Sequence, residues 1–417
     1  MLFSAALVAA SAVYVRSAAA SASAAASATS TSTLSTSTSD SSGASACTPV
    51  AGGSSSTDDT PAIASAIAEC ASGTIVIPAD TTYYINSALS FDGCSDCTLQ
   101  VEGTLLVSDD TDYWNGVTAV FLAKDITGLT VTSETGTGLF DGNGQASWDL
   151  FATDSSYARP TLFYVDGSSD VTISNLVFQN APNVFHSSTG GSSNVVYSDI
   201  TLTAISTSDN DAKNTDGWDI GESTYVTIHT ATVINDDDCV AFKPGASYVE
   251  VYDISCNGSH GISVGSLGAS SGSTDTVENI YVRGATMVNS AKASGIKLYP
   301  GGDDYGTAVV SNVTFTDFTV DGSAYAFQVQ SCYNGDQDYC SEYPSNATLT
   351  DIVISGFAGT TSTDYAPATA NINCPADGTC GITISDWSVE AGSGTAEALC
   401  ANTPSDLGVT CTDGASG

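Results

Sequence analysis

Four residues have the types and the spacing that acid/base chemistry requires. Asp216 stands in the run NTDGWD, Asp237 and Asp238 in NDDDC, and His260 in GSHG. Asp237 follows Asp216 by 21 residues, and His260 follows Asp238 by 22. A repeat of about this length is typical of a coiled solenoid, in which equivalent positions stack at about 4.8 Å. We therefore expect the three carboxyl groups and the imidazole to lie together on one face as an acid/base site.

Other interpretations of these motifs remain open at this stage. NTDGWD contains ordinary turn residues, and NDDDC also fits a solvated turn or a calcium site. Paired carboxylates with split pKa values are also what glycosidic hydrolysis needs. Ser-His-Asp chemistry is disfavoured because no nucleophile elbow between a strand and a helix is apparent. The other two histidines, His186 and His229, are interpreted as structural.

Charge and composition limit the possible partners. The 417 residues contain 46 acidic and only 8 basic side chains, for a net charge of −38, which argues against nucleic acid as a partner. The acidity fits a soluble secreted protein, an acidic working environment, or both. Because basic residues are scarce, those near the acidic motifs become candidate residues of the functional site: Lys213, Lys243 and Lys297.

The N-terminal region predicts export. Residues 1–20 fit a signal peptide rather than a membrane span, and residues 21–46 fit a flexible linker rich in Ser, Thr and Ala. The folded domain is expected to occupy residues 47–417. The predicted location is therefore extracellular, with no membrane partner and a monomeric state. Three sequons, at Asn257, Asn312 and Asn346, agree with this and need surface positions.

The even number of cysteines, 12, predicts disulfides formed in an oxidising compartment. A zinc site at Cys94-x-x-Cys97 is the competing interpretation, but no second CxxC pair supports it. The expected local pairs are Cys47 with Cys70, Cys94 with Cys97, Cys239 with Cys256, Cys332 with Cys340, Cys374 with Cys380, and Cys400 with Cys411.

The pattern of short apolar segments predicts an all-β chain. One helix is expected over residues 58–72, with Ile63, Ile67 and Ala71 on one face, and it suits the cap of a solenoid end. After it, β-branched segments break at turn residues and resume, at spacings from the twenties to about forty residues. This favours a single parallel β-helix. A β-sandwich is the alternative, although it requires closely spaced hairpin turns.

Several motifs in the same order carry a family resemblance. NTDGWD, NDDDC, GSHGISVGSLG and SGIK closely resemble the four motifs of the polygalacturonases, family 28 of the glycoside hydrolases. DGNGQASWD and ARP, at Asp141 and Ala158, also resemble that family's first coils. The resemblance extends from Cys47 to Cys411. It implies a right-handed parallel β-helix that hydrolyses α-1,4 bonds of a galacturonan with inversion, without metal or cofactor.

Catalytic roles follow from the resemblance, motif by motif. Asp237 is expected to be the general acid that protonates the leaving oxygen, while Asp216 and Asp238 hold the water. His260 is expected to tune the protonation of the acid.

Substrate-binding roles follow in the same way. Lys297 is expected to bind a galacturonate carboxylate as a point charge, and Tyr325 in AYAFQVQ matches the family's tyrosine beside the substrate. Lys243 and Asn214 are further expected substrate contacts. The partner implied is a pectic polysaccharide.

One departure from the family pattern concerns substrate choice. The usual endo-acting motif is Arg-Ile-Lys, whereas this chain has Gly295-Ile296-Lys297. The change removes a cation and is expected to open space in the cleft. The sequence therefore resembles the xylogalacturonan hydrolases first and the exopolygalacturonases second. Two alternatives of other kinds are an eliminating pectin lyase-type β-helix and a noncatalytic polysaccharide-binding solenoid.

Overall fold

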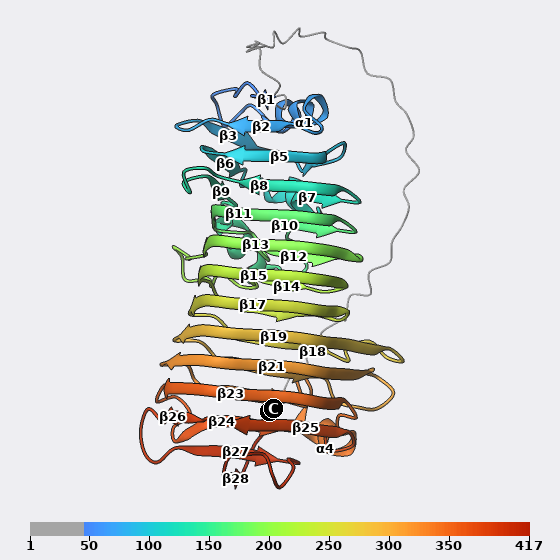
Figure 1. Ribbon diagram of the computed structural model, residues 1–417, viewed down its shortest axis with the longest axis vertical. Coiled ribbons are helices and arrows are strands. Elements are labelled where there is room, and N and C mark those ends of the chain that lie inside the picture. Colours follow the sequence, from blue (N-terminus) through green and yellow to red (C-terminus); the bar gives the residue numbers. More distant parts are fainter. Residues whose placement is uncertain (1–45) are drawn as a thin grey trace, which may run out of the picture. The chain divides into compact units, whose positions relative to one another are not determined.

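Short parallel strands, stacked coil upon coil, build a right-handed parallel β-helix (Figure 1). The computed structural model describes residues 46–417. The predicted signal peptide and nearly all of the predicted linker lie outside the described residues. Every strand pair between residues 46 and 417 is parallel, which contradicts the sandwich alternative and confirms the solenoid.

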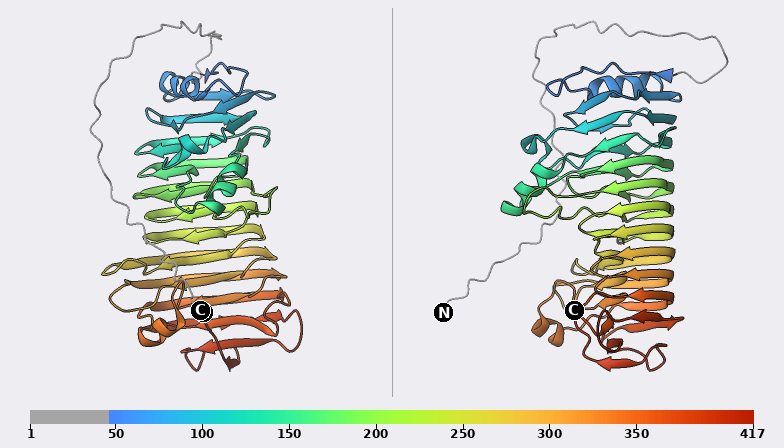
Figure 2. Two further views of the ribbon diagram at one scale, coloured as in Figure 1. Left: turned by 180° about the vertical axis from the view of Figure 1, so that it is seen from behind. Right: turned by 90° about the vertical axis from the view of Figure 1, so that its left-hand side faces the viewer.

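The strands form two long sheets that run side by side along the stack (Figure 2). The larger sheet contains β1 (Ala46–Cys47), β2 (Thr74–Ile77), β3 (Thr82–Ile85), β5 (Ser95–Val101), β6 (Thr104–Val107), β8 (Thr127–Thr132), β9 (Leu139–Asp141), β11 (Ser169–Gln179), β13 (Ser192–Thr203), β15 (Ser223–Ile234), β17 (Ala246–Asn257), β19 (Thr274–Val288), β21 (Thr307–Asp321), β23 (Thr348–Thr360), β25 (Thr379–Ser385) and β26 (Ser388–Glu390). The smaller sheet contains β4 (Leu89–Ser90), β7 (Ala119–Lys124), β10 (Thr161–Asp166), β12 (His186–Thr189), β14 (Trp218–Ile220), β16 (Asp238–Phe242), β18 (Gly261–Leu267), β20 (Ser294–Leu298), β22 (Phe327–Gln330), β24 (Ala368–Asn373), β27 (Glu397–Ala401) and β28 (Cys411–Asp413).

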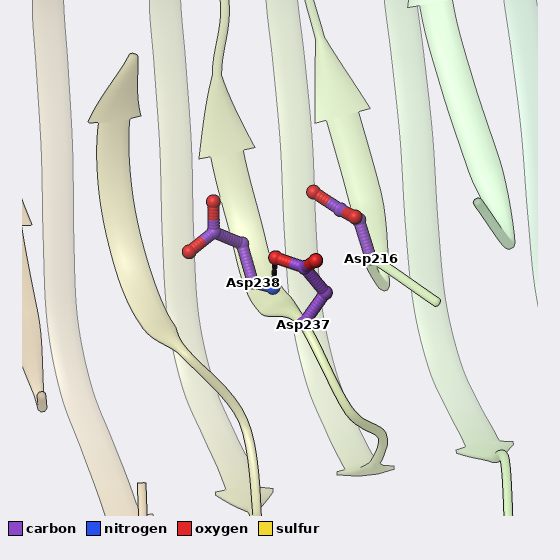
Figure 3. A group of neighbouring side chains, drawn as sticks. All are labelled: Asp216, Asp237 and Asp238. Atoms are coloured by element: carbon purple, nitrogen blue, oxygen red, sulfur yellow. Dashed lines mark hydrogen bonds between the residues drawn. The ribbon is translucent and has the colours of Figure 1, made fainter. Parts of the chain in front are cut away.

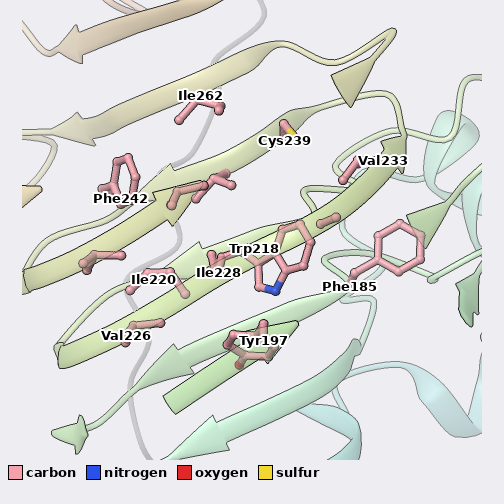
Figure 4. Packing of buried hydrophobic residues seen from close by; sticks show 14 of the residues in the cluster. Phe185, Tyr197, Trp218, Ile220, Val226, Ile228, Val233, Cys239, Phe242 and Ile262 are labelled. Atoms are coloured by element: carbon pink, nitrogen blue, oxygen red, sulfur yellow. The ribbon is translucent and has the colours of Figure 1, made fainter. Parts of the chain in front are cut away.

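The core is the interior of the coil, filled by alternate side chains of both sheets (Figure 4). Because the coils stack in register, like residues lie above one another: Val226 pairs with Val249, and Val249 with Ile280. His186 belongs to this core, as predicted. Its ring is fully buried and stacks on Trp218, with centroids 5.5 Å apart, and burial lowers its pKa to about 3.

The N-terminal helix α1 (Thr60–Glu69) lies at the first coil, where it was expected, and buries Ile63 and Ile67. The other helices are α2 (Thr111–Trp114), α3 (Gln145–Thr153) and α4 (Gln337–Glu342). Helix α3 was not predicted, because DGNGQASWD has no long apolar period. Between residues 46 and 417, no helix is long and apolar enough to cross a membrane.

All six predicted disulfides are present. The pairing of Cys94 with Cys97 contradicts the zinc alternative. Cys239–Cys256 is the bond nearest to the acidic motifs, because Cys239 directly follows Asp238. It ties β16 of the smaller sheet to β17 of the larger one, across the interior of the coil.

Asn235 supports the corner that carries the aspartates. Its side chain is 4% exposed, and its amide nitrogen donates to the backbone oxygens of Thr215, Asp237 and Asp238 at 2.8, 3.0 and 3.0 Å. Two coils are thereby joined by one carboxamide. Buried carbonyls that lose such a partner are costly, so the corner depends on this side chain.

We expect Asn235→Ala to lower the free energy of unfolding by about 2 kcal/mol, because the Thr215 carbonyl loses its side-chain donor and the Asp237 and Asp238 carbonyls each lose one of two donors. Urea unfolding followed by tryptophan fluorescence measures this. Asn115→Ala is the control, since exposed Asn115 only accepts one bond, from the Ala158 amide. Equal losses in the two variants would contradict the supporting role of Asn235.

Candidate active site

The three aspartates lie together at the beginnings of neighbouring strands of the smaller sheet (Figure 3). Asp216 precedes β14, Asp238 begins β16 and Asp237 stands just before it. One oxygen from each carboxyl group lies within 4.8 Å of the others. Together with Asn214, Lys243 and Lys297 they line a cleft of about 370 Å³. The predicted convergence of these motifs is therefore present.

Asp237 is held by three hydrogen bonds. Its Oδ1 accepts from the Asp238 amide at 2.8 Å and lies 3.1 Å from His260 Nδ1, while Asn214 donates to Oδ2 at 3.1 Å. Burial raises the pKa of Asp237, but the hydrogen bond and charge of His260 outweigh it and bring the pKa to about 2. The same hydrogen bond raises the pKa of His260, whose side chain is 46% exposed. The pair therefore rests as imidazolium and carboxylate at mildly acidic pH.

Asp238 is the most enclosed of the three, with 1% exposure. Lys297 Nζ lies 2.5 Å from its Oδ2, and Ser263 donates to its Oδ1 at 2.9 Å. Burial raises the pKa of Asp238, but the charges of Lys297, Lys292 and Lys243 together lower it below its ordinary value. Asp238 is accordingly ionised and can accept hydrogen bonds from a bound water.

Asp216 has the opposite electrostatic environment. Burial, followed by the negative charge of Asp219, raises its pKa well above the ordinary value of 3.8. Lys243 offsets this in part, with Nζ 3.6 Å from Asp216 and 3.3 Å from Asp219. Carboxyls this close titrate as a group, so the cluster holds its most stable carboxyl proton on Asp216 rather than on Asp237. This differs from what is expected of Asp237 as the general acid, which must carry a proton before it protonates the leaving oxygen.

The carboxyl spacing does not by itself predict stereochemistry. Inverting glycosidases usually separate their two carboxyls by about 6.5–9.5 Å, and retaining ones by about 5–5.5 Å. Here the oxygens lie within 4.8 Å of one another. Inversion therefore rests on the family resemblance alone and stays a prediction. The absence of a metal also stays a prediction, since three carboxyls this close have the donor set of a cation site.

Tyr325 does not reach the cleft. It lies three coils away from Asp237, 8% exposed, with its ring stacked on Tyr365 at 4.8 Å. Tyr333 occupies the expected place instead, lining the cleft with its ring centroid 5.6 Å from Lys297 Nζ. The structure therefore does not bring Tyr325 to the aspartate cluster, and its role as a substrate contact stays a prediction. Tyr333 follows β22 in a loop, and only the path of that loop determines which tyrosine meets the lysine.

The space above Gly295 is filled. A Cβ at Gly295 would lie 2.8 Å from both Cδ and Cε of Lys292, and 2.6 Å from the Gln328 carbonyl. Lys292 is 4% exposed and donates to the His260 carbonyl at 2.9 Å. The expectation that Gly295 leaves an open cleft without a cation is therefore corrected. Lys292, which stands two residues before β20, covers Gly295, and its positive charge helps to lower the pKa of Asp238.

Arg159 is a second cation that sequence reasoning missed. Its guanidinium donates to Asn214 Oδ1 at 2.7 Å and lies 3.8 Å from the ring centroid of Phe151 in α3. The contact orients the Asn214 amide so that its nitrogen faces Asp237. The scarcity of basic residues was the available signal for Arg159 and Lys292. Lys213, the third lysine predicted as a candidate, is exposed and does not line the cleft.

Comparison with known proteins agrees with this geometry. The family model of glycosyl hydrolases family 28 matches residues 68–411. Endo-xylogalacturonan hydrolase A of Aspergillus tubingensis is 61% identical over 372 residues, which cover 89% of this chain and 91% of that protein. A probable endo-xylogalacturonan hydrolase A of Aspergillus niger is 60% identical over the same shares.

Solved structures show the same relationship. The crystal structure of endo-xylogalacturonan hydrolase from Aspergillus tubingensis superposes with a TM-score of 0.88 at 63% identity, over 89% of this chain and 100% of that chain. Polygalacturonase from Erwinia carotovora shares the fold, with a TM-score of 0.63 at 18% identity, over 89% of this chain and 99% of that chain.

The parallel β-helix and the clustered carboxyl groups, together with the family match, define the class of protein as glycoside hydrolase. The chain belongs to glycosyl hydrolases family 28. It is therefore a glycoside hydrolase, and the lyase and the noncatalytic solenoid are not supported.

We expect Lys292→Met to move the acidic limb of the pH–rate profile upward, because Asp238 loses one of the cations that keep its pKa low. A shift of one pKa unit gives about a tenfold lower kcat/KM at the acidic end, with a smaller loss near pH 6. Values of kcat/KM measured from about pH 3 to about pH 7 test the predicted shift. Lys124→Met is the control, since Lys124 pairs only with Asp166 at the surface. Parallel profiles for Lys292→Met and the native enzyme would contradict the prediction.

Proposed function

We propose that this protein is a secreted enzyme that hydrolyses α-1,4-galacturonosidic bonds in xylose-substituted galacturonan, with inversion. The 61% identity to an endo-xylogalacturonan hydrolase over 89% of the chain is the observation that supports the proposed substrate. Six disulfides support an oxidising, extracellular location. The proposed partner is the pectic polysaccharide alone, bound by a monomer.

Asp237 is the proposed proton donor. In the resting site the proton lies on the imidazolium of His260, hydrogen-bonded to Asp237 Oδ1 at 3.1 Å. A substrate carboxylate that enters the cleft adds negative charge and raises the pKa of the neighbouring acids. This favours transfer of the proton onto Asp237, which then passes it to the leaving glycosidic oxygen as the C–O bond breaks.

Asp216 and Asp238 are the proposed holders of the attacking water. Asp238 stays ionised beside Lys297 and orients the water through hydrogen bonds. Asp216, with its raised pKa, is the better acceptor for the proton that the water loses as its oxygen bonds to the anomeric carbon. At the working pH Asp216 must first be ionised, which Lys243 favours.

Lys297 and Tyr333 are the proposed contacts to a substrate carboxylate. The Lys297 ammonium has three donors, of which Asp238 uses one, and 7% of its side chain is exposed. Tyr333 places a ring beside that ammonium. Lys243 and Asn214 line the same cleft and extend the proposed contact surface.

Product analysis on two substrates tests the proposal. We expect xylosylated oligomers from xylogalacturonan and little release from plain polygalacturonate, and NMR of the first products should show the inverted anomer. Asp237→Asn should lower kcat by about 10²–10⁴, the usual contribution of a general acid. Galacturonate monomer as the main product from polygalacturonate would make the enzyme an exopolygalacturonase instead.

The His260–Asp237 pair predicts a mildly acidic optimum. The pKa of His260 is raised above 6.5. The stability that the His260–Asp237 pair contributes is therefore fully present below that pH and is lost as the pH rises through the raised pKa. The pKa of Asp237 falls from 3.8 to about 2, so its contribution is lost as the pH falls toward that value. Stability and kcat/KM should both be greatest between about pH 4 and 6.5.

His260→Gln should remove the alkaline decline and lower kcat/KM at pH 5 by about a hundredfold, the contribution of a proton-transfer partner. His229→Gln is the matched control, because its ring stacks on Tyr252 and meets Thr230 Oγ1 at 3.2 Å on the larger sheet. An unchanged alkaline limb in His260→Gln, or an optimum above neutrality, would show that this pair does not govern activity.

A further inference from the structure

One column of bends on the larger sheet carries tyrosines where neighbouring coils carry Asn or Asp. All seven residues of the column have φ between +53° and +57°. Asn and Asp tolerate this left-handed region, whereas a tyrosine there is strained, and strain that persists points to a function. The strand registers place them in this order: Asp170, Asn194, Tyr225, Tyr248, Asn279, Asn312 and Asp351.

The two tyrosines form one wall of a hollow outside the catalytic cleft. The rings of Tyr225 and Tyr248 stack with centroids 5.1 Å apart, and the residues are 58% and 49% exposed. Tyr281, 41% exposed, adds a third ring from the next coil. The hollow has a volume of about 430 Å³ and lies on β15, β17, β19 and β21. Three exposed aromatic rings around one depression mark a binding surface.

Asn312 lines the far end of the same hollow. It begins the sequon Asn312-Val313-Thr314, it is exposed, and Thr314 lies opposite Tyr281 in the strand register. Its Nδ2, the atom that accepts a glycan, donates to Asn279 Oδ1 at 2.8 Å and so points along the column toward Tyr248. Two coils, about 10 Å, separate Asn312 from Tyr248, a span of about two sugar rings.

We propose that Asn312 carries an N-linked glycan whose first sugars pack against Tyr281 and Tyr248. In the attachment step the amide nitrogen bonds to the anomeric carbon of a lipid-diphosphate-linked oligosaccharide. The bond between that carbon and the diphosphate breaks, and the amide proton is released. The apolar faces of the sugar rings then cover aromatic surface that water otherwise contacts. The modification presupposes the secretion proposed above.

Charge and tethering favour this occupant over a pectic chain. Glu250 lines the hollow, the protein has a net charge of −38, and a galacturonan is itself a polyanion. The core of an N-linked glycan is neutral and meets no such repulsion. Its covalent bond to Asn312 also holds it at high effective concentration beside the rings.

The experiment uses the full chain secreted from a eukaryotic host. Glycopeptide mass spectrometry reads the occupancy of Asn312, with the sequon at Asn257 as the control for passage through the secretory compartment. Melting temperatures are then compared for the native protein, Tyr248→Asn, Thr314→Ala and the double variant. Thr314→Ala removes the sequon while Asn312 stays in place.

We expect Asn312 to be glycosylated, and Tyr248→Asn to lower Tm by about 2 °C when the glycan is present. Without the glycan, in the Thr314→Ala background, the same substitution should raise Tm, because Asn suits the left-handed bend. An unmodified Asn312 overturns the proposal, as does a Tm shift of the same sign in both backgrounds. Tyr248-dependent binding of the Thr314→Ala protein to wall polysaccharide also overturns it, because the hollow is then a polysaccharide site.

Discussion

The stacking of parallel coils in register is the constraint on which the rest of the structure depends. It places residues that are 21 to 23 positions apart in the chain at strand spacing from one another. Gly217 donates to the Asp238 carbonyl, and the His260 amide donates to the Asp237 carbonyl, so each motif is bonded to the next. The active-site cleft is therefore a direct product of the coil, and corner residues such as Asn235 hold its spacing.

Bringing carboxyl groups this close creates repulsion that buried cations offset. Lys243, Lys292, Lys297 and Arg159 lie at the cleft, which is half of the eight basic residues in the chain. The cations are distributed unequally, and the pKa values separate as a result. Asp238, beside Lys297, stays ionised, while Asp216, beside Asp219, holds a proton more readily. Such a separation lets chemically identical residues take different roles in one reaction.

The same stacking has a second consequence on the larger sheet. A bend that repeats over seven coils forms a column, and five of these coils fill it with Asn or Asp because these side chains suit a positive φ. Tyr225 and Tyr248 interrupt that column and, because of the register, must lie face to face. Because equivalent positions stack, the solenoid brings side chains of one kind next to each other. It does so for the aspartates of the cleft and for the tyrosines beside the Asn312 sequon.

The sequence by itself determined the features that depend on period and local spacing. These include the parallel β-helix, the capping helix, the six short-range disulfides and the convergence of Asp216, Asp237, Asp238 and His260. Only the tertiary structure decided that Tyr333 rather than Tyr325 meets Lys297, that Lys292 fills the space above Gly295, and that Arg159 orients Asn214. A repeat fixes where a strand lies, whereas loop paths and long side chains depend on neighbours several coils apart.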